Sequence, residues 1–528
     1  MKKYCFLFIL VCILLLNGCF GDGYSKSNDP EIYLSYELLE NGTYRINGFS
    51  TKPVRNLVIP SYIKGIKVTS IAESAFEVKQ VIGLRPKDIE SVVIEEGIKI
   101  IDNYAFKNCG ATSYKLSDSI EIIGESAFSD NCERTINLPK NIKEIGNYAF
   151  SSVTFLSELY LDKVLLGEGV FYRSNVRKVT FSDYYTEIPN RLFCEVSSLE
   201  EVVIPDTCTK IGDEAFKSTN IKNIVFCENL SYFGDRAFFG SRLESIVFNA
   251  EYINMNYSSF GDLDRLNTIT FNNTKLIDNV SQAFNSTNFK EIYLNDVENY
   301  CIVNKGLCEG TKLLLAPNNF DNFEGISIIS SYAMAGRDYS NLTIPNDVTV
   351  DSNAFNGSKI ENLILYSSNV NTKAFYYTTI NKMAISTKVI RKDVFYNVSD
   401  LKVIEFLEGV ETIQTEAFVC LHELETIYLP ASLKQIKTAG FIQCSRLKNV
   451  YYNLKQGDPA DLYAGSFVQY ISNVLTETGQ INATINSDLK IYVNADIYDK
   501  CLKSWNKMPI GEHYIYHDNL INHIELYE

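Results

Sequence analysis

The sequence predicts a repeat solenoid, a β-rich stack of right-handed coils with about 17 repeats of roughly 20–24 residues each. Three observations predict it: a small residue followed by phenylalanine recurs at near-constant spacing, a short strand pattern stands between copies, and residues 51–475 hold no linker-like stretch. A chain of 528 residues would otherwise be expected to divide into several domains. Repetition explains the length instead.

The small-Phe pair is the most regular feature of the chain. Clear copies are Ala75-Phe76, Ala105-Phe106, Ala127-Phe128, Ala149-Phe150, Ala215-Phe216, Ala237-Phe238, Ala283-Phe284, Ala354-Phe355, Ala374-Phe375 and Ala417-Phe418. From Phe106 to Phe284 the successive phenylalanines lie 21 to 24 residues apart. Each phenylalanine is predicted to fill the inside of one coil, and the coils must be stabilised by stacking, since one coil alone cannot bury both of its faces.

A second element, apolar-x-x-apolar-x-apolar, lies between the small-Phe pairs, as at Leu199–Ile204 and Leu243–Phe248. Its last three residues alternate inward, outward and inward, as a short strand requires. A proline then follows in several copies, as at Leu429-Pro430, and removes a backbone donor where pairing should stop. Stronger copies continue with Ile-Gly, as at Ile211-Gly212, where the glycine predicts a turn into the small-Phe segment.

The N-terminus indicates export. Residues 1–18 have the charged start and short apolar core of a secretory signal. The sequence Leu16-Asn17-Gly18-Cys19 resembles the bacterial lipoprotein box, which implies that Cys19 becomes an acylated first residue. The chain is therefore predicted to be exported, lipid-anchored to the bacterial membrane and displayed at the cell surface. The alternative is an ordinary secretory signal with an incidental cysteine.

Both ends of a coil stack need caps, because an open end exposes core and unpaired strand edge. The predicted divisions are a signal peptide at 1–18, a lipidated N-terminus, short tether and N-terminal cap at 19–50, the solenoid at 51–475 and a C-terminal cap at 476–528. The first cap is predicted to be a hairpin around Asn41-Gly42. The second is predicted to be a last strand at Asp488–Val493 followed by an amphipathic helix at Ile497–Trp505.

These motifs together resemble the BspA-type leucine-rich repeat. The residues that carry the resemblance are Ala-Phe-x-x-Cys at Ala105–Cys109, Ala-Phe-Val-Cys-Leu at Ala417–Leu421, Leu-Glu-Thr-Ile-Tyr-Leu-Pro at Leu424–Pro430, and the Ile-Gly pairs. The resemblance covers nearly everything from residue 45 onward. It implies a secreted or surface-attached bacterial repeat protein, often a lipoprotein, with adhesion or host-ligand binding known for some members. The motif itself is structural and transfers no ligand-binding residue.

The sequence departs from the repeat between residues 285 and 350. There Gly306-Leu307 and Ala333-Met334 stand in place of small-Phe. We expect irregular coils or a bend in this stretch.

One residue of each strand is expected to face outward between two inward residues, which makes a column along the outer side of the sheet. The column consists of Val58, Val93, Lys115, Asn137, Tyr160, Thr180, Val203, Val225, Val247, Thr270, Tyr293, Leu314, Thr343, Ile364, Ala384, Glu405, Tyr428 and Tyr451. It is short of charge in an acidic chain. We hypothesise a partly apolar docking face formed by Tyr160, Val203, Val225, Val247, Tyr293, Tyr428 and Tyr451. The alternative is that such residues are simply those that a sheet surface prefers.

Charge and motifs narrow the class of function. The net charge is −15, which disfavours nucleic acid and anionic membrane surfaces as partners. The sequence has no phosphate-binding glycine loop, no HExxH and no paired acids, so we predict no enzyme activity, no cofactor and no metal. Cys420 and His422 are close in sequence without a third orienting group, and their proximity is interpreted as coincidence.

Four cysteines, Cys109, Cys132, Cys420 and Cys444, follow their small-Phe pairs and are predicted to be buried thiols, although disulfides between neighbouring coils remain open. The predicted function is binding of a protein or glycan on a host or neighbouring cell, in adhesion or host interaction. The alternatives are a scaffold protein that binds partners within its own envelope and, third, a carbohydrate-active enzyme.

Overall fold

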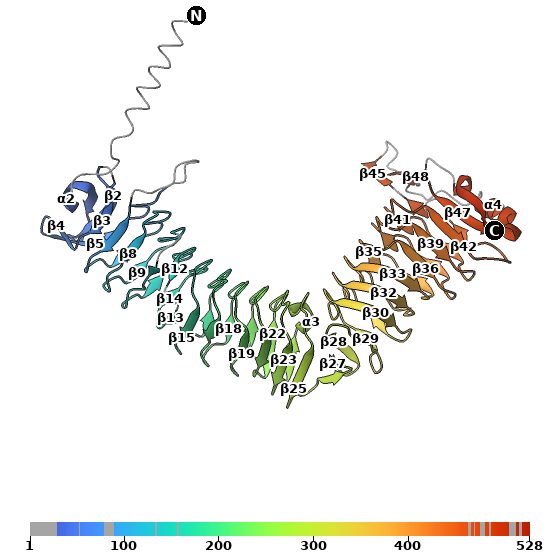
Figure 1. Cartoon of the computed structure of the whole chain (residues 1–528), viewed down its shortest axis with the longest axis horizontal. Coiled ribbons are helices and arrows are strands. Elements are labelled where there is room, and N and C mark those ends of the chain that lie inside the picture. Colours follow the sequence, from blue (N-terminus) through green and yellow to red (C-terminus); the bar gives the residue numbers. More distant parts are fainter. Residues whose placement is uncertain are drawn as a thin grey trace, which may run out of the picture. The chain divides into compact units, whose positions relative to one another are not determined.

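The computed structural model describes residues 29–51, 53–78, 89–131, 135–155, 158–462, 466–468, 470–475, 481–484, 487–505, 514–516 and 520–527. The described chain forms two compact units, Met1–Arg242 and Leu243–Glu528. The predicted repeat solenoid is confirmed: about 17 turns stack short strands in parallel within the described residues (Figure 1). The export signal and Cys19 lie outside the described residues.

In the Met1–Arg242 unit, each coil contributes a strand to an outer sheet and a second strand just before the small-Phe segment. The outer strands are β3 (Asn56–Ile59), β6 (Ser91–Ile94), β8 (Ser113–Lys115), β10 (Thr135–Ile136), β13 (Glu158–Leu161), β15 (Lys178–Phe181), β17 (Glu201–Val203) and β19 (Asn223–Val225). The second strands are β5 (Ile66–Ile71), β7 (Ile100–Ile101), β9 (Ile122–Ile123), β11 (Glu144–Ile145), β14 (Leu165–Leu166), β16 (Glu187–Ile188), β18 (Lys210–Ile211) and β20 (Tyr232–Phe233). Strand β4 (Tyr62–Ile63) pairs with β5, and β12 (Thr154–Phe155) pairs with β10.

The Leu243–Glu528 unit repeats this plan. Its outer strands are β21 (Ser245–Phe248), β23 (Thr268–Asn272), β25 (Glu291–Asn295), β30 (Asp338–Ile344), β32 (Lys359–Leu365), β33 (Thr379–Ile385), β36 (Val403–Phe406), β39 (Thr426–Leu429), β42 (Asn449–Tyr452), β47 (Lys490–Asn494) and β49 (Ile524–Tyr527). The second strands are β22 (Tyr252–Met255), β24 (Leu276–Asp278), β29 (Ile328–Ile329), β31 (Thr349–Val350), β34 (Val389–Ile390), β37 (Thr412–Ile413), β40 (Gln435–Ile436) and β43 (Asp461–Leu462). A third set, β35 (Phe395–Tyr396), β38 (Phe418–Val419), β41 (Phe441–Ile442) and β44 (Phe467–Val468), holds small-Phe phenylalanines.

The small-Phe phenylalanines form the core, as predicted. Phe106 stacks on Phe128 with ring centroids 5.3 Å apart, and both rings are fully buried. In the second unit Phe418 lies between Phe395 and Phe441, with centroids 5.1 and 4.7 Å away. Stacked rings at this separation gain dispersion contacts in addition to burial. The repeat length therefore brings each ring onto the ring of the next coil.

The glycine of Ile-Gly has a different role from the predicted turn. Gly212 is absent from the residues with positive φ, and an added Cβ would lie 2.4 Å from Asn190 Oδ1 of the preceding coil. Close approach of two coils therefore requires the glycine. The left-handed turn falls two residues later, at Glu214, with φ of 53°.

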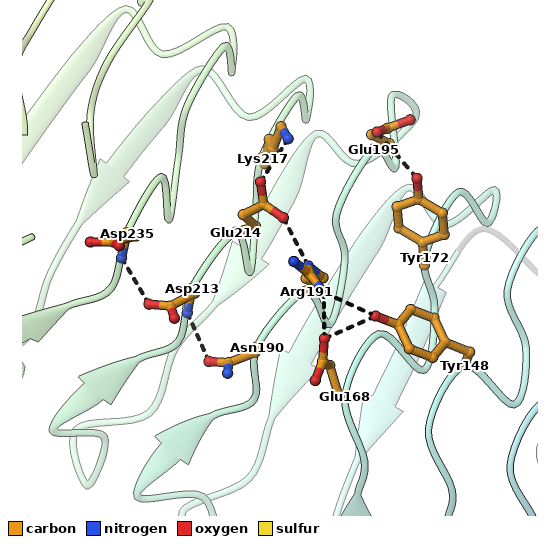
Figure 2. Close-up of polar contacts among 10 residues, drawn as sticks. All are labelled: Tyr148, Glu168, Tyr172, Asn190, Arg191, Glu195, Asp213, Glu214, Lys217 and Asp235. Carbon is orange, nitrogen blue, oxygen red and sulfur yellow. Dashed lines mark hydrogen bonds and ion pairs between the residues drawn. The ribbon is translucent and has the colours of Figure 1, made fainter. Parts of the chain in front are cut away.

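Where the coils approach closely, polar side chains form a ladder of hydrogen bonds from one coil to the next. Asn190 Oδ1 accepts the Asp213 backbone N–H at 2.8 Å, and Asp213 Oδ1 accepts the Asp235 backbone N–H at 2.8 Å (Figure 2). Each side chain thus satisfies a backbone donor that the short second strand leaves unpaired.

The N-terminal hairpin is present. Helix α2 (Pro30–Tyr33) leads into β1 (Leu34–Leu38), which pairs antiparallel with β2 (Tyr44–Phe49), and β2 pairs parallel with β5. At the other end the predicted amphipathic helix is η1 (Ala495–Ile497) followed by α4 (Tyr498–Trp505), and Trp505 Nε1 donates to the Ala460 carbonyl at 2.8 Å.

The predicted strand at Asp488–Val493 is present as β47 (Lys490–Asn494), but it is not the last strand, because β49 pairs parallel with β47 beyond it. The unit also contains β45 (Tyr470–Leu475), β46 (Ile481–Thr484), β48 (Tyr514–Tyr516) and η2 (Leu520–His523), of which the three strands form a separate small sheet.

The irregular stretch lies where the sequence predicts it. Ala333-Met334 keeps the small-Phe geometry, since the Met334 N–H donates to the Ala354 carbonyl of the next coil. Gly306-Leu307 does not keep it. Asn304 and Lys305 both have positive φ, which makes a tight hairpin turn, so β26 (Cys301–Val303), β27 (Gly306–Glu309) and β28 (Lys312–Leu315) pair antiparallel.

A buried arginine holds this stretch to the regular coils. Arg337 has an exposed fraction of 0%, and its guanidinium donates to the carbonyls of Ala333, Ala335 and Phe284. Burial lowers its pKa. Phe284 belongs to the short helix α3 (Val280–Ala283) at its C-cap, so one side chain joins segments 53 residues apart.

Candidate functional site

All seven residues of the predicted docking face lie on outer strands. Tyr160 and Val225 are 66% exposed, whereas Val247 and Tyr451 are half-buried. The remaining three, Val203, Tyr293 and Tyr428, are exposed. The face is thus accessible, but its members belong to separate runs of strands and to two units.

Register defines which of them are neighbours. Tyr160 pairs with Thr180, which pairs with Val203, in the first unit. Val247 pairs with Thr270, which pairs with Tyr293, in the second. Leu314 is not part of the column, because β28 pairs with β29, a second strand, rather than with an outer strand.

The longest uninterrupted run of the column lies in the second unit. Its paired residues are, in order, Thr343, Ile364, Ala384, Glu405, Tyr428, Tyr451, Tyr492 and Glu525. Each occupies the same position on the next strand, so their side chains stand in one row. This run brings three tyrosines together.

We call Tyr428, Tyr451 and Tyr492 the tyrosine ladder. The ring centroids of Tyr428 and Tyr451 are 5.0 Å apart with an interplanar angle of 13°, and those of Tyr451 and Tyr492 are 4.7 Å apart at 12°. Tyr492 was missed at the level of sequence because its segment was interpreted as a cap. The alternation in Lys490–Asn494, which puts Tyr492 between the buried Ile491 and Val493, is the signal that identifies it.

Stacking determines which parts of the three tyrosine rings a ligand can contact. Parallel rings about one strand spacing apart cover one another's faces, so the edges and the hydroxyl ends face outward. The result is a row of apolar edges with phenol hydroxyls that repeats at the spacing of the strands. Because each ring is held by its neighbour, little side-chain entropy is left to lose on binding.

A glutamate stands at each end of the tyrosine ladder. Glu405 is exposed and has no ion-pair partner among the described residues. Glu525 pairs with Lys490 at 2.8 Å, and this hydrogen bond raises the pKa of Lys490. A cavity of about 720 Å³ adjoins Tyr492, with Lys448 and His523 in its lining. The row of aromatic edges therefore leads into a polar recess.

A second polar cluster lies on the small-Phe side of the first unit (Figure 2). Arg191 donates to Glu168 Oε1 and to Glu214 Oε2, both at 2.8 Å, and the other oxygen of Glu214 pairs with Lys217 at 2.7 Å. Tyr148 donates its hydroxyl to Glu168 at 2.9 Å. The cluster therefore links side chains from successive coils.

The charged side chains of this cluster form ion pairs with one another. Burial of Glu214 acts to raise its pKa, but the hydrogen bonds from Lys217 and Arg191 outweigh burial and lower the pKa. A general acid in glycoside hydrolysis needs a raised carboxyl pKa, so Glu214 is unsuited to that role. The cluster stabilises the stacking of coils.

The cysteines and histidines give no reactive site among the residues described. Burial raises the pKa of the Cys109 thiol to about 11 and that of Cys444 to about 12, as expected of thiols that pack as small apolar groups. Cys420 is only partly buried, and its thiol donates to Gln443 rather than to His422. Cys132 lies outside the described residues.

The described residues hold neither a metal-binding cluster nor a membrane-spanning helix. They contain no group of three or more His, Cys, Asp or Glu that could hold a metal ion. Within the same residues, no helix has both the length and the apolar character needed to cross a membrane.

The fold and the outer face define a leucine-rich-repeat solenoid. A family model described as the BspA type leucine rich repeat region matches residues 85–199, 186–306 and 321–454, which together span more than half of the chain. This protein belongs to the BspA-type leucine-rich-repeat family. No match was found among curated proteins.

Several solved structures resemble this chain at low similarity. A leucine rich cell surface protein from Faecalibacterium prausnitzii A2-165 is 20% identical, with 82% of this chain and 96% of that chain covered and a TM-score of 0.35. A leucine-rich repeat protein from Eubacterium ventriosum is 16% identical, with 86% and 98% covered and a TM-score of 0.39. A leucine-rich repeat protein from Bacteroides ovatus is 17% identical, with 94% and 100% covered and a TM-score of 0.30.

Proposed function

We propose that this protein is a bacterial cell-surface binding protein that holds a protein or glycan ligand against the outer face of its leucine-rich-repeat sheet, in adhesion or host interaction. The observation that carries the proposal is the tyrosine ladder, three stacked and in-register aromatic residues on an exposed sheet face. Tyrosine is enriched among residues that dominate binding energy, because it combines apolar area with a hydroxyl and loses little entropy.

The surroundings support a polar partner. Glu405 flanks the tyrosine ladder at one end, Glu525 flanks it at the other in an ion pair with Lys490, and the whole chain carries a net charge of −15. Complementary potential favours a neutral or basic ligand over an anionic one. Nucleic acid is disfavoured for the same reason.

The proposal includes export and lipid anchoring through Cys19, which rest on the sequence of residues 1–19 and on membership of the family. It assigns no enzyme activity. A solenoid that binds ligands needs only an extended face, whereas catalysis needs groups with perturbed pKa in a cleft.

The test uses purified residues 20–528 and a panel of extracellular-matrix proteins, mucins and host-cell surfaces. Binding is compared with a triple variant, Y428S/Y451S/Y492S, and with a matched triple variant, Y62S/Y184S/Y252S, whose tyrosines are 54–56% exposed and lie off the column. Loss of three contact tyrosines should weaken binding at least about 30-fold, since a hot-spot residue contributes about 2 kcal/mol or more. The matched variant should bind as the parent does.

Three outcomes would count against the proposal. Equal loss in both triple variants, with folding intact by circular dichroism, would remove the tyrosine ladder as the contact. Absence of binding to every panel member by a folded parent chain would favour the scaffold role within the protein's own envelope. Protection of the protein from protease on intact cells would point the same way.

A further inference from the structure

A cavity in the Leu243–Glu528 unit lies where the repeat is irregular. Its volume is about 910 Å³. One wall is formed around the starts of β23 and β25, another by the tip of the hairpin between β26 and β27, and a third by residues 317–322. It is separate from the tyrosine ladder and from the cluster of Figure 2.

Asparagine dominates the lining. The six asparagines are Asn267, Asn288, Asn304, Asn318, Asn319 and Asn322. A carboxamide carries two donors and an acceptor oxygen, and a hydroxyl group also donates and accepts, so asparagine side chains match an array of hydroxyls.

The charges of the lining balance. Its acids are Asp264, Glu291 and Asp321, and its bases are Arg265, Lys290 and Lys305. Three of each sign leave no net charge in a chain that is strongly acidic overall. A neutral polar ligand therefore fits the cavity better than an anion or a cation.

Two of the asparagines are unsatisfied. The Oδ1 atoms of Asn288 and Asn318 are buried and have no hydrogen-bond partner among the described residues. A buried acceptor without a donor destabilises the fold, and such a group in a native protein calls for a physical reason. Both residues line the cavity, and the soft χ2 rotation of asparagine can turn the oxygen toward a hydroxyl bound there.

The walls are fixed in place before any ligand binds. Asn304 Nδ2 donates to the carbonyls of Asn322 at 3.2 Å and Glu324 at 2.9 Å, which ties the hairpin tip to the opposite wall. Phe289, in the lining, lies under the Arg337 guanidinium at 5.3 Å, and its carbonyl accepts the Asn318 N–H at 3.3 Å. Preorganised polar walls reduce the ordering cost of binding.

We propose that this cavity is a binding site for a neutral saccharide, whose hydroxyls the asparagine carboxamides hold. The size suits a mono- or disaccharide, since cavities of about 300–1,000 Å³ take small ligands. Asn288 and Asn318 are the residues that gain hydrogen bonds on binding. The site is independent of the tyrosine ladder, so either can fail without the other.

The experiment is saturation-transfer difference NMR of residues 20–528 with a panel of neutral mono- and disaccharides, beside glucuronate and glucosamine as charged probes. At least one neutral sugar should give signal, and the charged probes should give less. The variants N288A, N318A and N267A should each weaken that binding by about tenfold or more, as expected when one hydrogen-bonding side chain at a polar site is removed. N453A changes an exposed asparagine elsewhere and should not.

Three results would overturn the proposal. The first is no signal from any neutral sugar at millimolar concentration with a folded protein. The second is sugar binding that the three asparagine variants leave unchanged. The third is sugar binding that Y428S/Y451S/Y492S abolishes, because that would place the sugar on the tyrosine ladder. N267A alters an exposed side chain, so it keeps the test valid if the two partly buried variants misfold.

Discussion

Replacing Gly212 by alanine tests how the coils stack. The added Cβ would lie 2.4 Å from Asn190 Oδ1, 2.7 Å from Asn190 N and 2.9 Å from the Ile188 carbonyl oxygen. The side-chain contact can be relieved by moving Asn190, but the two backbone contacts cannot. Moving Asn190 also breaks its hydrogen bond with the Asp213 N–H.

The expected cost has two parts. Forcing a methyl group against fixed backbone costs about 1–3 kcal/mol, and losing the Asp213 hydrogen bond costs about 1 kcal/mol. G212A should therefore lower the free energy of unfolding by about 2–4 kcal/mol. G310A is the matched control, because a Cβ there meets nothing within 4 Å and carries only the cost of a left-handed φ, about 1–2 kcal/mol.

Urea unfolding followed by circular dichroism gives the global value, and hydrogen exchange measured on peptides covering residues 190–235 gives the local one. The local measurement is needed because coils in a solenoid unfold partly independently. The double variant N190A/G212A should remain destabilised, since the backbone contacts persist. A G212A protein within 0.5 kcal/mol of the parent, or more stable than G310A, would refute the close-approach explanation.

Three further predictions follow from single side chains. R337M should lower the free energy of unfolding by about 1–3 kcal/mol in thermal or urea unfolding, because the buried Ala335 carbonyl loses its donor and the carbonyls of Ala333 and Phe284 each lose one of two donors; equal stability would contradict this. Hydrogen bonds from Lys143 and Lys99 lower the pKa of Glu121 from 4.5 to about 2, so the contribution of Glu121 to stability is present above pH 4.5 and is lost as the pH falls toward 2. E121Q should therefore flatten this part of the curve of unfolding free energy against pH, and an unchanged curve would contradict the assignment. Iodoacetamide at pH 8 should modify the exposed Cys301 before the buried Cys444, whose pKa is about 12, and mass spectrometry of the tryptic peptides decides the order.

Much of the fold was predictable because every coil must place the same few residue types at the same positions. The recurring pattern has three parts, namely inward apolar residues, a phenylalanine inside each coil and a proline after the strand. When these parts recur together at a fixed spacing, they indicate a solenoid. The role of Gly212 was not predictable from the sequence, because it depends on contact with Asn190 of the preceding coil. The repeat pattern does not give the distance between neighbouring coils.

The irregular stretch at residues 285–350 was likewise only partly predictable from the sequence. Gly306-Leu307 has the composition of a small-Phe pair, but the Asn304-Lys305 turn overrides it and makes a hairpin. Arg337 gives no sequence signal of burial, since arginine is rarely buried without an acidic partner. Its carbonyl acceptors come from two distant segments and emerge only in the folded chain.

The outer column was predictable as a row, but the tyrosine ladder was only partly so. Tyr428 and Tyr451 follow from strand alternation, whereas their stacking and the addition of Tyr492 depend on the register of β42 with β47. Ligand identity does not follow from the column, because sheet propensity and binding favour the same residues.

The most direct test of binding at the tyrosine ladder is chemical protection of tyrosine hydroxyls. The protein is treated with N-acetylimidazole with and without a ligand found in the binding panel, and acetylation is quantified residue by residue by mass spectrometry. Binding at the tyrosine ladder predicts that Tyr428, Tyr451 and Tyr492 lose reactivity on binding while Tyr62 and Tyr252 keep theirs. Protection at Tyr62 or Tyr252 with an unprotected tyrosine ladder would contradict it.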